Sequence, residues 1–288
     1  MRLVVLLAIF FVACSGNEIP NSKAESLHSQ IFTDSLFTSG IEGPAIDSFG
    51  NLYLVNFNHE GSIGIIKSGD SLPQLFVDLP DSSIGNGIRF DLQNNMYVAD
   101  YKNHNVLKID ISTKNISVFA HDSSMNQPND LAIMKNGILF ASDPNWKNSN
   151  GKLWRINKNG RTSLLEDSMG TTNGVEVATD QKHLYVNESV QRNIWIYDLD
   201  ALGNISNKRK FIDFPDGGMD GMRCDKNGNL FVARYDKGVV LKIDPEGKII
   251  SEFKLHGMKP TNVTFSKDEK KIFVTMQDMK WVEVINLE

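Results

Sequence analysis

Cysteine is scarce in this chain: Cys14 and Cys224 are the only two among 288 residues. If Cys14 is acylated, as the N-terminal segment predicts, no intrachain disulfide can form and the hydrophobic core alone must stabilise the fold. We expect Cys224, at an apolar strand position, to be a small buried side chain. Paired His or Cys residues at zinc-site spacing are also missing, and no segment has the roughly 3.6-residue apolar period of a long helix.

Clusters of basic residues are missing as well. The chain has 30 Lys and Arg against 35 Asp and Glu, a formal net charge of −5, with no basic run or basic aromatic stripe. We therefore expect no nucleic-acid partner. A hydrophobic content of 41% and a charged content of 23% are ordinary for a soluble globular protein.

The long apolar run of the chain is Leu3–Ala13, which ends at Cys14. It is too short to span a bilayer and has the length of a signal-peptide core. Phe11–Cys14 resembles the bacterial lipobox, although Leu is usual where Phe11 stands. We predict a lipoprotein-type signal peptide at residues 1–13, lipidation of Cys14 and a tether over 14–28. The protein would be an exported bacterial lipoprotein, periplasmic or on the cell surface, that meets the membrane only through its lipid anchor; a plain secretory signal is the alternative.

One short pattern recurs six times along the rest of the chain. Each copy opens with a carboxylate or amide residue and continues with alternating apolar positions, a turn rich in Asp, Asn, Gly and Lys, and an apolar-aromatic strand. The six opening residues are Glu42, Asn86, Asn129, Asn173, Asp220 and Asn262. Their spacings of 44, 43, 44, 47 and 42 residues are typical of propeller blades and not of stacked helical repeats.

Each repeat contains about four strands separated by turn signals. In the second repeat these are Gly87–Asp91, Met96–Asp100, Val106–Ile111 and Ile116–Phe119. The sixth copy has room for only three strands before Glu288, and Gln30–Asp34 is predicted to supply the fourth, which removes an exposed sheet edge. We predict an all-β fold: a six-bladed β-propeller of four-stranded antiparallel blades over residues 29–288, closed into a ring by this N-terminal strand.

The first strand of a propeller blade lines the central channel, so the six opening side chains should meet at the channel mouth. The turn preference of Asn and Asp is a purely structural alternative. A ring of carboxylate and amide oxygens suits a hard cation, Ca²⁺ ahead of Mg²⁺ or Mn²⁺. Glu42 and Asp220 would balance the charge of a divalent ion, and we read Asn86 and Asn262 as lining the channel.

A second polar column lies about fourteen residues after the first. Its members are Asn56, Asp100, Asp143, Glu188, Arg234 and Gln277. For Asp143, which precedes Pro144, we expect a role in a turn or behind the site in preference to catalysis.

Four of the repeat openings resemble a known family. They are Glu42-Gly43-Pro44, Pro128-Asn129-Asp130, Asn173-Gly174 and Asp220-Gly221, in this order. From about residue 30 to its end, the chain resembles the gluconolactonase/regucalcin (senescence marker protein, SMP-30) family. Its members are six-bladed propellers that hold a divalent metal, often Ca²⁺, at the channel mouth, and many hydrolyse lactones.

This resemblance implies a set of site residues. The metal ligands would be Glu42, Asn129, Asn173 and Asp220, with Asn129 a ligand or a holder of water or substrate. Asp220 would also be the general base or nucleophile. The cofactor would be Ca²⁺, with Mg²⁺, Mn²⁺ or Zn²⁺ as alternatives.

A departure from the family pattern concerns the substrate. Many relatives that hydrolyse sugar lactones carry Arg just before the Pro/Phe-Asn-Asp segment, and Gln127 stands there in this chain. We predict that Gln127 and Asn129 contact the substrate and that Trp146, in the loop 145–151, forms a wall of the pocket. Packing of Trp146 against its blade is the alternative.

These observations predict a divalent-metal-dependent hydrolase of carboxylic esters, specifically a lactonase. The metal would polarise the carbonyl of a small lactone or ester while a carboxylate activates water. The alternative is a non-catalytic propeller that binds a small ligand or a protein at the channel mouth. The presence of both Glu42 and Asp220 favours the enzyme, and the oligomeric state is left open.

Overall fold

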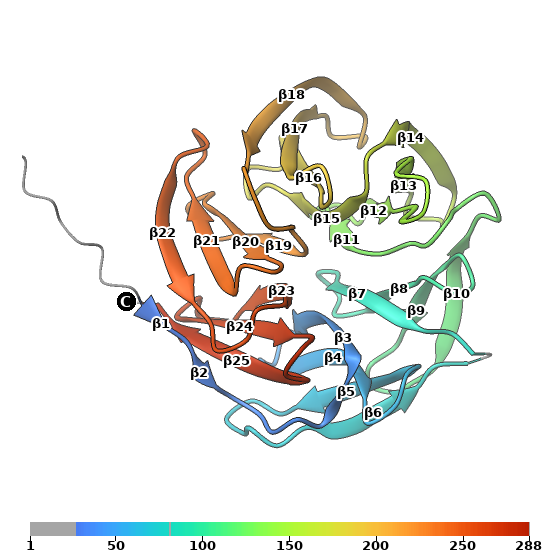
Figure 1. Ribbon diagram of the computed structural model, residues 1–288. Coiled ribbons are helices and arrows are strands. Elements are labelled where there is room, and N and C mark those ends of the chain that lie inside the picture. Colours follow the sequence, from blue (N-terminus) through green and yellow to red (C-terminus); the bar gives the residue numbers. More distant parts are fainter. Residues whose placement is uncertain (1–26, 81, 288) are drawn as a thin grey trace, which may run out of the picture.

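Six β-sheets surround a central axis in the computed structural model, which describes residues 27–80 and 82–287 (Figure 1). The all-β, six-bladed propeller predicted from the repeat spacing is confirmed. The predicted signal peptide, Cys14 and residues 14–26 of the tether lie outside the described residues. Within the described part, the structure contains no helix long and apolar enough to cross a membrane.

Each blade is an antiparallel sheet whose strands follow one another from the axis outward. The first three blades are β3 (Phe37–Ile46), β4 (Leu52–Phe57), β5 (Ser62–Ile66) and β6 (Gln74–Asp78); β7 (Gly85–Phe90), β8 (Met96–Asp100), β9 (Asn105–Ile109) and β10 (Ile116–His121); and β11 (Leu131–Ile133), β12 (Leu139–Asp143), β13 (Gly151–Ile156) and β14 (Thr162–Met169). The last three are β15 (Thr172–Val177), β16 (His183–Glu188), β17 (Asn193–Leu199) and β18 (Ile205–Asp213); β19 (Met222–Cys224), β20 (Leu230–Arg234), β21 (Val239–Ile243) and β22 (Ile249–Lys254); and β23 (Pro260–Phe265), β24 (Lys271–Met276), β25 (Trp281–Asn286) and β2 (Gln30–Ile31).

The hydrophobic core lies between neighbouring blades. The second strand of a blade is covered on both faces, so all six residues of β4 and all five of β8 are buried, whereas most of the outermost β18 is exposed. Tyr53 and Val55 of blade one pack with Val98 of blade two in one of six such clusters. Because each blade buries apolar side chains only against its neighbours, the ring must close for the first and last blades to be covered.

Closure uses the N-terminal segment, as predicted. β2 pairs antiparallel with β25, with Gln30 opposite Val284, and the N–H of Phe32 donates to the Val282 carbonyl at 2.8 Å. The regular strand is two residues long where Gln30–Asp34 was expected, because the chain then turns inward toward β3. One further pairing was not predicted. β1 (Leu27–His28), at the end of the expected tether, runs parallel to β22, so the N-terminal segment joins the edges of blades five and six (Figure 1).

A recurring aspartate turn follows the inner strand in three blades. In each, the Asp accepts the backbone N–H of the residue four positions on, and the side-chain amide of that Asn donates to the same carboxylate at 2.8 Å. The pairs are Asp47 with Asn51, Asp91 with Asn95 and Asp225 with Asn229. This local chemistry explains the Asp- and Asn-rich turns of the repeat and sets the register of the first two strands.

Candidate metal and substrate site

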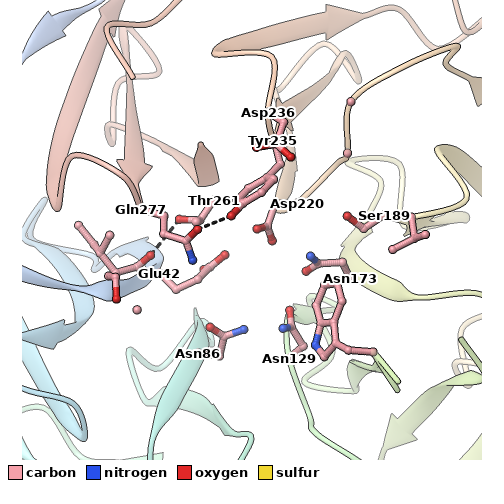
Figure 2. A pocket seen from close by; sticks show the side chains of 17 residues that line it. Glu42, Asn86, Asn129, Asn173, Ser189, Asp220, Tyr235, Asp236, Thr261 and Gln277 are labelled. Carbon is pink, nitrogen blue, oxygen red and sulfur yellow. Dashed lines mark hydrogen bonds between the residues drawn. The ribbon is translucent and has the colours of Figure 1, made fainter. Parts of the chain in front are cut away.

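The opening residues of five repeats meet around one cavity of about 460 Å³ (Figure 2). These residues are Glu42, Asn86, Asn129, Asn173 and Asp220. The structure thus brings together all four side chains that the resemblance nominated as metal ligands. Of the sixth repeat, Thr261 lines the cavity instead of Asn262.

Asn262 has a different place from the one we expected for it. It is fully buried, and its Nδ2 donates to Oε2 of Glu42 at 3.0 Å. It is thus not among the described residues that line the cavity, although its side chain contacts the ring of openings through Glu42. The register of β23 against β24 shifts between Pro260 and Asn262, and the backbone N–H of Asn262 donates to the Thr275 hydroxyl at 2.9 Å. Asn262 orients the Glu42 carboxylate from behind.

Glu42 is a buried carboxylate held in a fixed orientation. Only 7% of its surface is exposed, and it also accepts a hydrogen bond from the backbone N–H of Gly43, which has a φ of +61°. A Cβ on that glycine would lie 2.1 Å from the carbonyl oxygen of Asn86, so only glycine fits there. Burial, followed by the negative charge of Asp130, raises the pKa of Glu42 to about 7.

Asp220 lies two residues before β19, and hydrogen bonds fix its backbone on both sides. Its N–H donates to the Ala233 carbonyl at 3.0 Å, and its own carbonyl accepts from Nδ2 of Asn187 at 2.6 Å. Burial raises the pKa of Asp220 well above its usual value, and the negative charges of Glu42 and Asp130 raise it further. Two neighbouring carboxylates, Glu42 buried and Asp220 half-buried, that disfavour ionisation in this way would be stabilised in their ionised forms by a cation.

Asn129 and Asn173 supply the uncharged oxygens. Within residues 27–80 and 82–287, the buried Oδ1 atom of each has no hydrogen-bond partner. The backbone of Asn129 is fixed, because its N–H donates to the Ser142 carbonyl and its carbonyl accepts from Gly87, each at 2.8 Å. A buried amide oxygen without a partner is costly, and a cation would satisfy it.

The donor set fits a hard divalent cation. It consists of two carboxylates and two amide oxygens, and the described chain has no group of three or more His, Cys, Asp or Glu side chains placed to hold a metal. Calcium accepts such mixed carboxylate and amide ligation, whereas zinc prefers nitrogen and sulfur.

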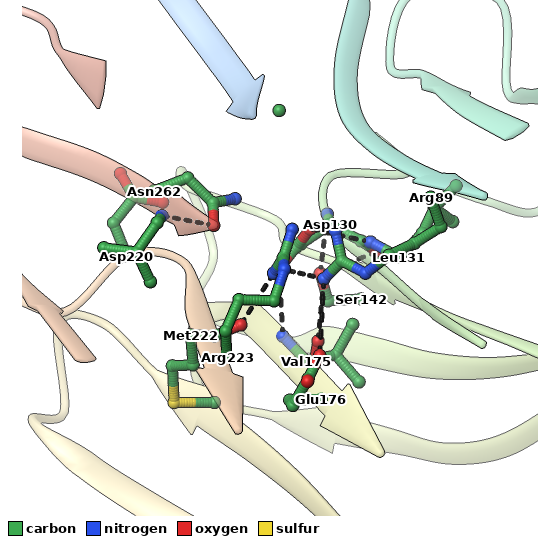
Figure 3. Close-up of polar contacts among 12 residues, drawn as sticks. Arg89, Asp130, Leu131, Ser142, Val175, Glu176, Asp220, Met222, Arg223 and Asn262 are labelled. Carbon is green, nitrogen blue, oxygen red and sulfur yellow. Dashed lines mark hydrogen bonds and ion pairs between the residues drawn. The ribbon is translucent and has the colours of Figure 1, made fainter. Parts of the chain in front are cut away.

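A buried charge network packs beside the site and was not foreseen (Figure 3). Arg89 Nη1 lies 3.2 Å from Oδ1 of Asp130, Arg223 Nη1 lies 3.7 Å from its Oδ2, and Arg89 Nη2 lies 3.7 Å from Oε2 of Glu176. Burial and the Arg89 charge lower the pKa of Arg223 to about 10, so the Arg223 guanidinium stays charged at neutral pH. These four residues fill the channel next to the cavity with paired charges.

The second polar column fastens the loops that carry the site. Asp143 accepts the backbone N–H groups of Asn126 and Gln127, at 2.8 and 2.5 Å, and the indole N–H of Trp154 at 2.9 Å. It thereby fixes the segment that leads into Asn129. The turn role expected for Asp143 is confirmed.

The two predicted substrate contacts outside the ligand set have different positions. Trp146 lines the cavity and is 49% exposed, so it forms part of the wall. Gln127 is half-buried and is not among the described residues that line this cavity. Its contact with substrate stays a prediction from the family pattern.

The sequence model of a protein family, the SMP-30/gluconolactonase/LRE-like region, matches residues 41–278. This match covers most of the chain and includes every residue of the ligand set. The chain belongs to this family.

Family relatives differ in how much of the chain they share. A gluconolactonase of Zymomonas mobilis is 27% identical over 216 residues, which are 66% of this chain and 60% of the relative. A pentonolactonase of Haloferax volcanii is 28% identical over 151 residues, 51% of this chain and 52% of the relative. The chain thus spans between half and two thirds of the length of these curated relatives.

The fold is shared over nearly the whole length with a solved structure. The crystal structure of regucalcin from Agrobacterium tumefaciens, described as a calcium-binding protein, superposes with a TM-score of 0.80 at 20% identity. The superposition covers 91% of this chain and 94% of the other.

Proposed function

We propose that this protein hydrolyses a lactone or a related carboxylic ester with the help of a divalent cation, Ca²⁺ in the first place. The observation that carries the proposal is the convergence of two carboxylates and two unpartnered amide oxygens on one cavity. Relatives named gluconolactonase and pentonolactonase, and a structural neighbour described as calcium-binding, support it.

Glu42, Asn129, Asn173 and Asp220 would hold the cation. When bound, it supplies Lewis acidity toward the carbonyl oxygen of the substrate. Asn262 and the Gly43 N–H keep the Glu42 carboxylate oriented, and the rigid backbone around Asn129 and Asp220 keeps the reacting groups in place.

Asp220 is the proton carrier in this proposal. The water oxygen forms a bond to the carbonyl carbon while one water proton passes to the Asp220 carboxylate. The ring C–O bond then breaks, and the same proton passes to the departing alkoxide, which leaves an open-chain hydroxy acid. Ligation to a cation lowers the basicity of a carboxylate, and the burial that raises the pKa of Asp220 opposes this loss.

Chelation tests the proposal. Protein treated with chelator and freed of metal is expected to lose hydrolysis of a panel of lactones and aryl esters, and added Ca²⁺ is expected to restore it, because the ligand set requires a cation. Initial rates by pH-indicator assay measure both steps, with Mg²⁺, Mn²⁺ and Zn²⁺ as comparison ions. Hydrolysis that survives chelation, or that is absent across the whole panel with every ion, would contradict the proposal and favour a binding-only propeller.

A further inference from the structure

The cavity wall carries charge of one sign. Glu42, Asp220 and Asp236 line it, and none of the described lining residues is Lys, Arg or His. Two lysines lie behind the wall: Lys259 Nζ is 5.5 Å from the ring centroid of the lining Tyr235, and Lys237 is paired with Asp216 at 2.7 Å. A divalent cation would offset the charges of Glu42 and Asp220 and leave that of Asp236. A negatively charged substituent on a ligand would then meet this carboxylate and no cationic side chain among the described lining residues.

One side of the cavity is apolar. Trp146, in the loop between β12 and β13, is 49% exposed, and Val190, in the loop between β16 and β17, is 59% exposed. They come from the adjacent blades three and four and line the same cavity as the ligand set. Large apolar side chains that stay exposed at a cavity wall gain free energy when an apolar group covers them.

The opposite side is polar. Thr261 and Gln277 of blade six line it, and the hydroxyl of Tyr235 donates to Oε1 of Gln277 (Figure 2). A ligand whose polar ring lay against the ligand set and blade six would therefore extend a substituent on the far side of the ring toward Trp146 and Val190.

We propose that the substrate is an uncharged lactone with an apolar substituent, which Trp146 and Val190 hold, and that lactones bearing phosphate, sulfonate or carboxylate groups are rejected. The inference that the ligand is a lactone rests on the proposed function. The neutrality of the ligand and the place of its substituent rest on the cavity wall alone.

Binding of lactams tests this separately from catalysis, because lactams keep the ring and carbonyl but resist hydrolysis. Calorimetric titration of the calcium-loaded protein would compare piperidin-2-one, 6-butylpiperidin-2-one and 6-oxopiperidine-2-carboxylate. Partial burial of the four carbons should strengthen binding of the butyl compound about tenfold or more over the parent ring. The carboxylate should bind more weakly than the parent.

Variants locate the effect. Trp146→Ala should remove most of the gain from the butyl group, Trp146→Phe should keep most of it, and Val190→Ala should reduce it. Val118→Ala is the matched control, because Val118 on the outer strand β10 is 58% exposed and away from the cavity. Melting temperatures would confirm that each variant is folded.

The outcomes distinguish the two proposals. A carboxylate lactam that binds as tightly as the butyl lactam, or a butyl gain that persists in Trp146→Ala, overturns the inference. If the lactams follow the expected order and no lactone is hydrolysed, the proposed function fails while the cavity inference stands. If lactones are hydrolysed with equal kcat/KM whatever their substituent, the proposed function stands and the cavity inference fails.

Discussion

Replacing Asp220 with Asn is expected to lower kcat/KM for lactone hydrolysis by about 10²–10⁴-fold, the usual contribution of a positioned general base. Asn has the same shape and can still offer one oxygen to a cation, but it cannot take a proton from water. Rates measured at saturating Ca²⁺ separate this loss from a weaker affinity for the metal. A variant that keeps activity within about tenfold of wild type would contradict the role given to Asp220.

The control for this variant is Asp167→Asn. Asp167 is an exposed residue of the outer strand β14, so its substitution makes the same change in charge away from the cavity. We expect its kcat/KM to equal that of wild type. Any comparable loss in this control would show that net charge, and not the position of Asp220, determines the rate.

Replacing Asp130 with Asn is expected to lower the free energy of unfolding by about 3–5 kcal/mol. Asp130 is 1% exposed and lies between the guanidinium groups of Arg89 and Arg223. The substitution keeps the side-chain volume. Arg89 retains Glu176 as a partner, whereas Arg223 loses the carboxylate with which it is paired, so the lost stability comes from an unpaired buried charge and not from a cavity. Chemical denaturation monitored by circular dichroism measures it.

A double variant tests whether the loss of stability in Asp130→Asn comes from the unpaired buried charge. Adding Arg223→Met to Asp130→Asn removes the orphaned charge and should recover part of the lost stability. A loss of less than about 1 kcal/mol in the single variant, or no recovery in the double variant, would show that the network is not a coupled charge cluster.

The fold could be predicted because the residues of each repeat determine its strands and turns locally. Period-2 apolar strands and Asp-rich turns at a nearly constant spacing specify blades, and a sixth repeat short of one strand requires a partner from elsewhere. The pairing of β1 with β22 could not be predicted. A two-residue parallel contact has no sequence pattern, because its hydrogen bonds are made by the backbone alone.

The meeting of the openings at one cavity could be predicted because each holds the same position in its repeat, and the choice of four of them as metal ligands followed from the family resemblance. The contact of Asn262 with Glu42 could not, since Asn262 stands at an irregularity in the pairing of β23 with β24 that has no sequence pattern. The sequence does contain a pattern that indicates the charge network. Three residues after their openings, the second, fourth and fifth repeats carry Arg89, Glu176 and Arg223, where the other repeats carry Ala or Phe. Charges at an alternating apolar position of buried strands indicate mutual pairing.

Binding of the cation should depend on pH. Because burial and Asp130 raise the pKa of Glu42 to about 7, the Glu42 carboxyl in the cation-free protein is protonated at about pH 5 and ionised at about pH 8. A cation binds the ionised form, so it must displace a proton at the lower pH. The affinity for the cation should therefore rise between about pH 5 and about pH 8. The number of protons that the protein releases to the buffer on binding should be largest at about pH 5.

Calorimetric titration of metal-free protein with Ca²⁺ tests the central claim most directly. We predict one Ca²⁺ per chain, tighter binding at about pH 8 than at about pH 5, and a loss of at least about tenfold in affinity for Asn173→Ala, which removes an unpartnered oxygen. The Asp167→Asn protein should bind as wild type does. Absence of binding at both pH values, or an affinity that Asn173→Ala leaves unchanged, would contradict the account.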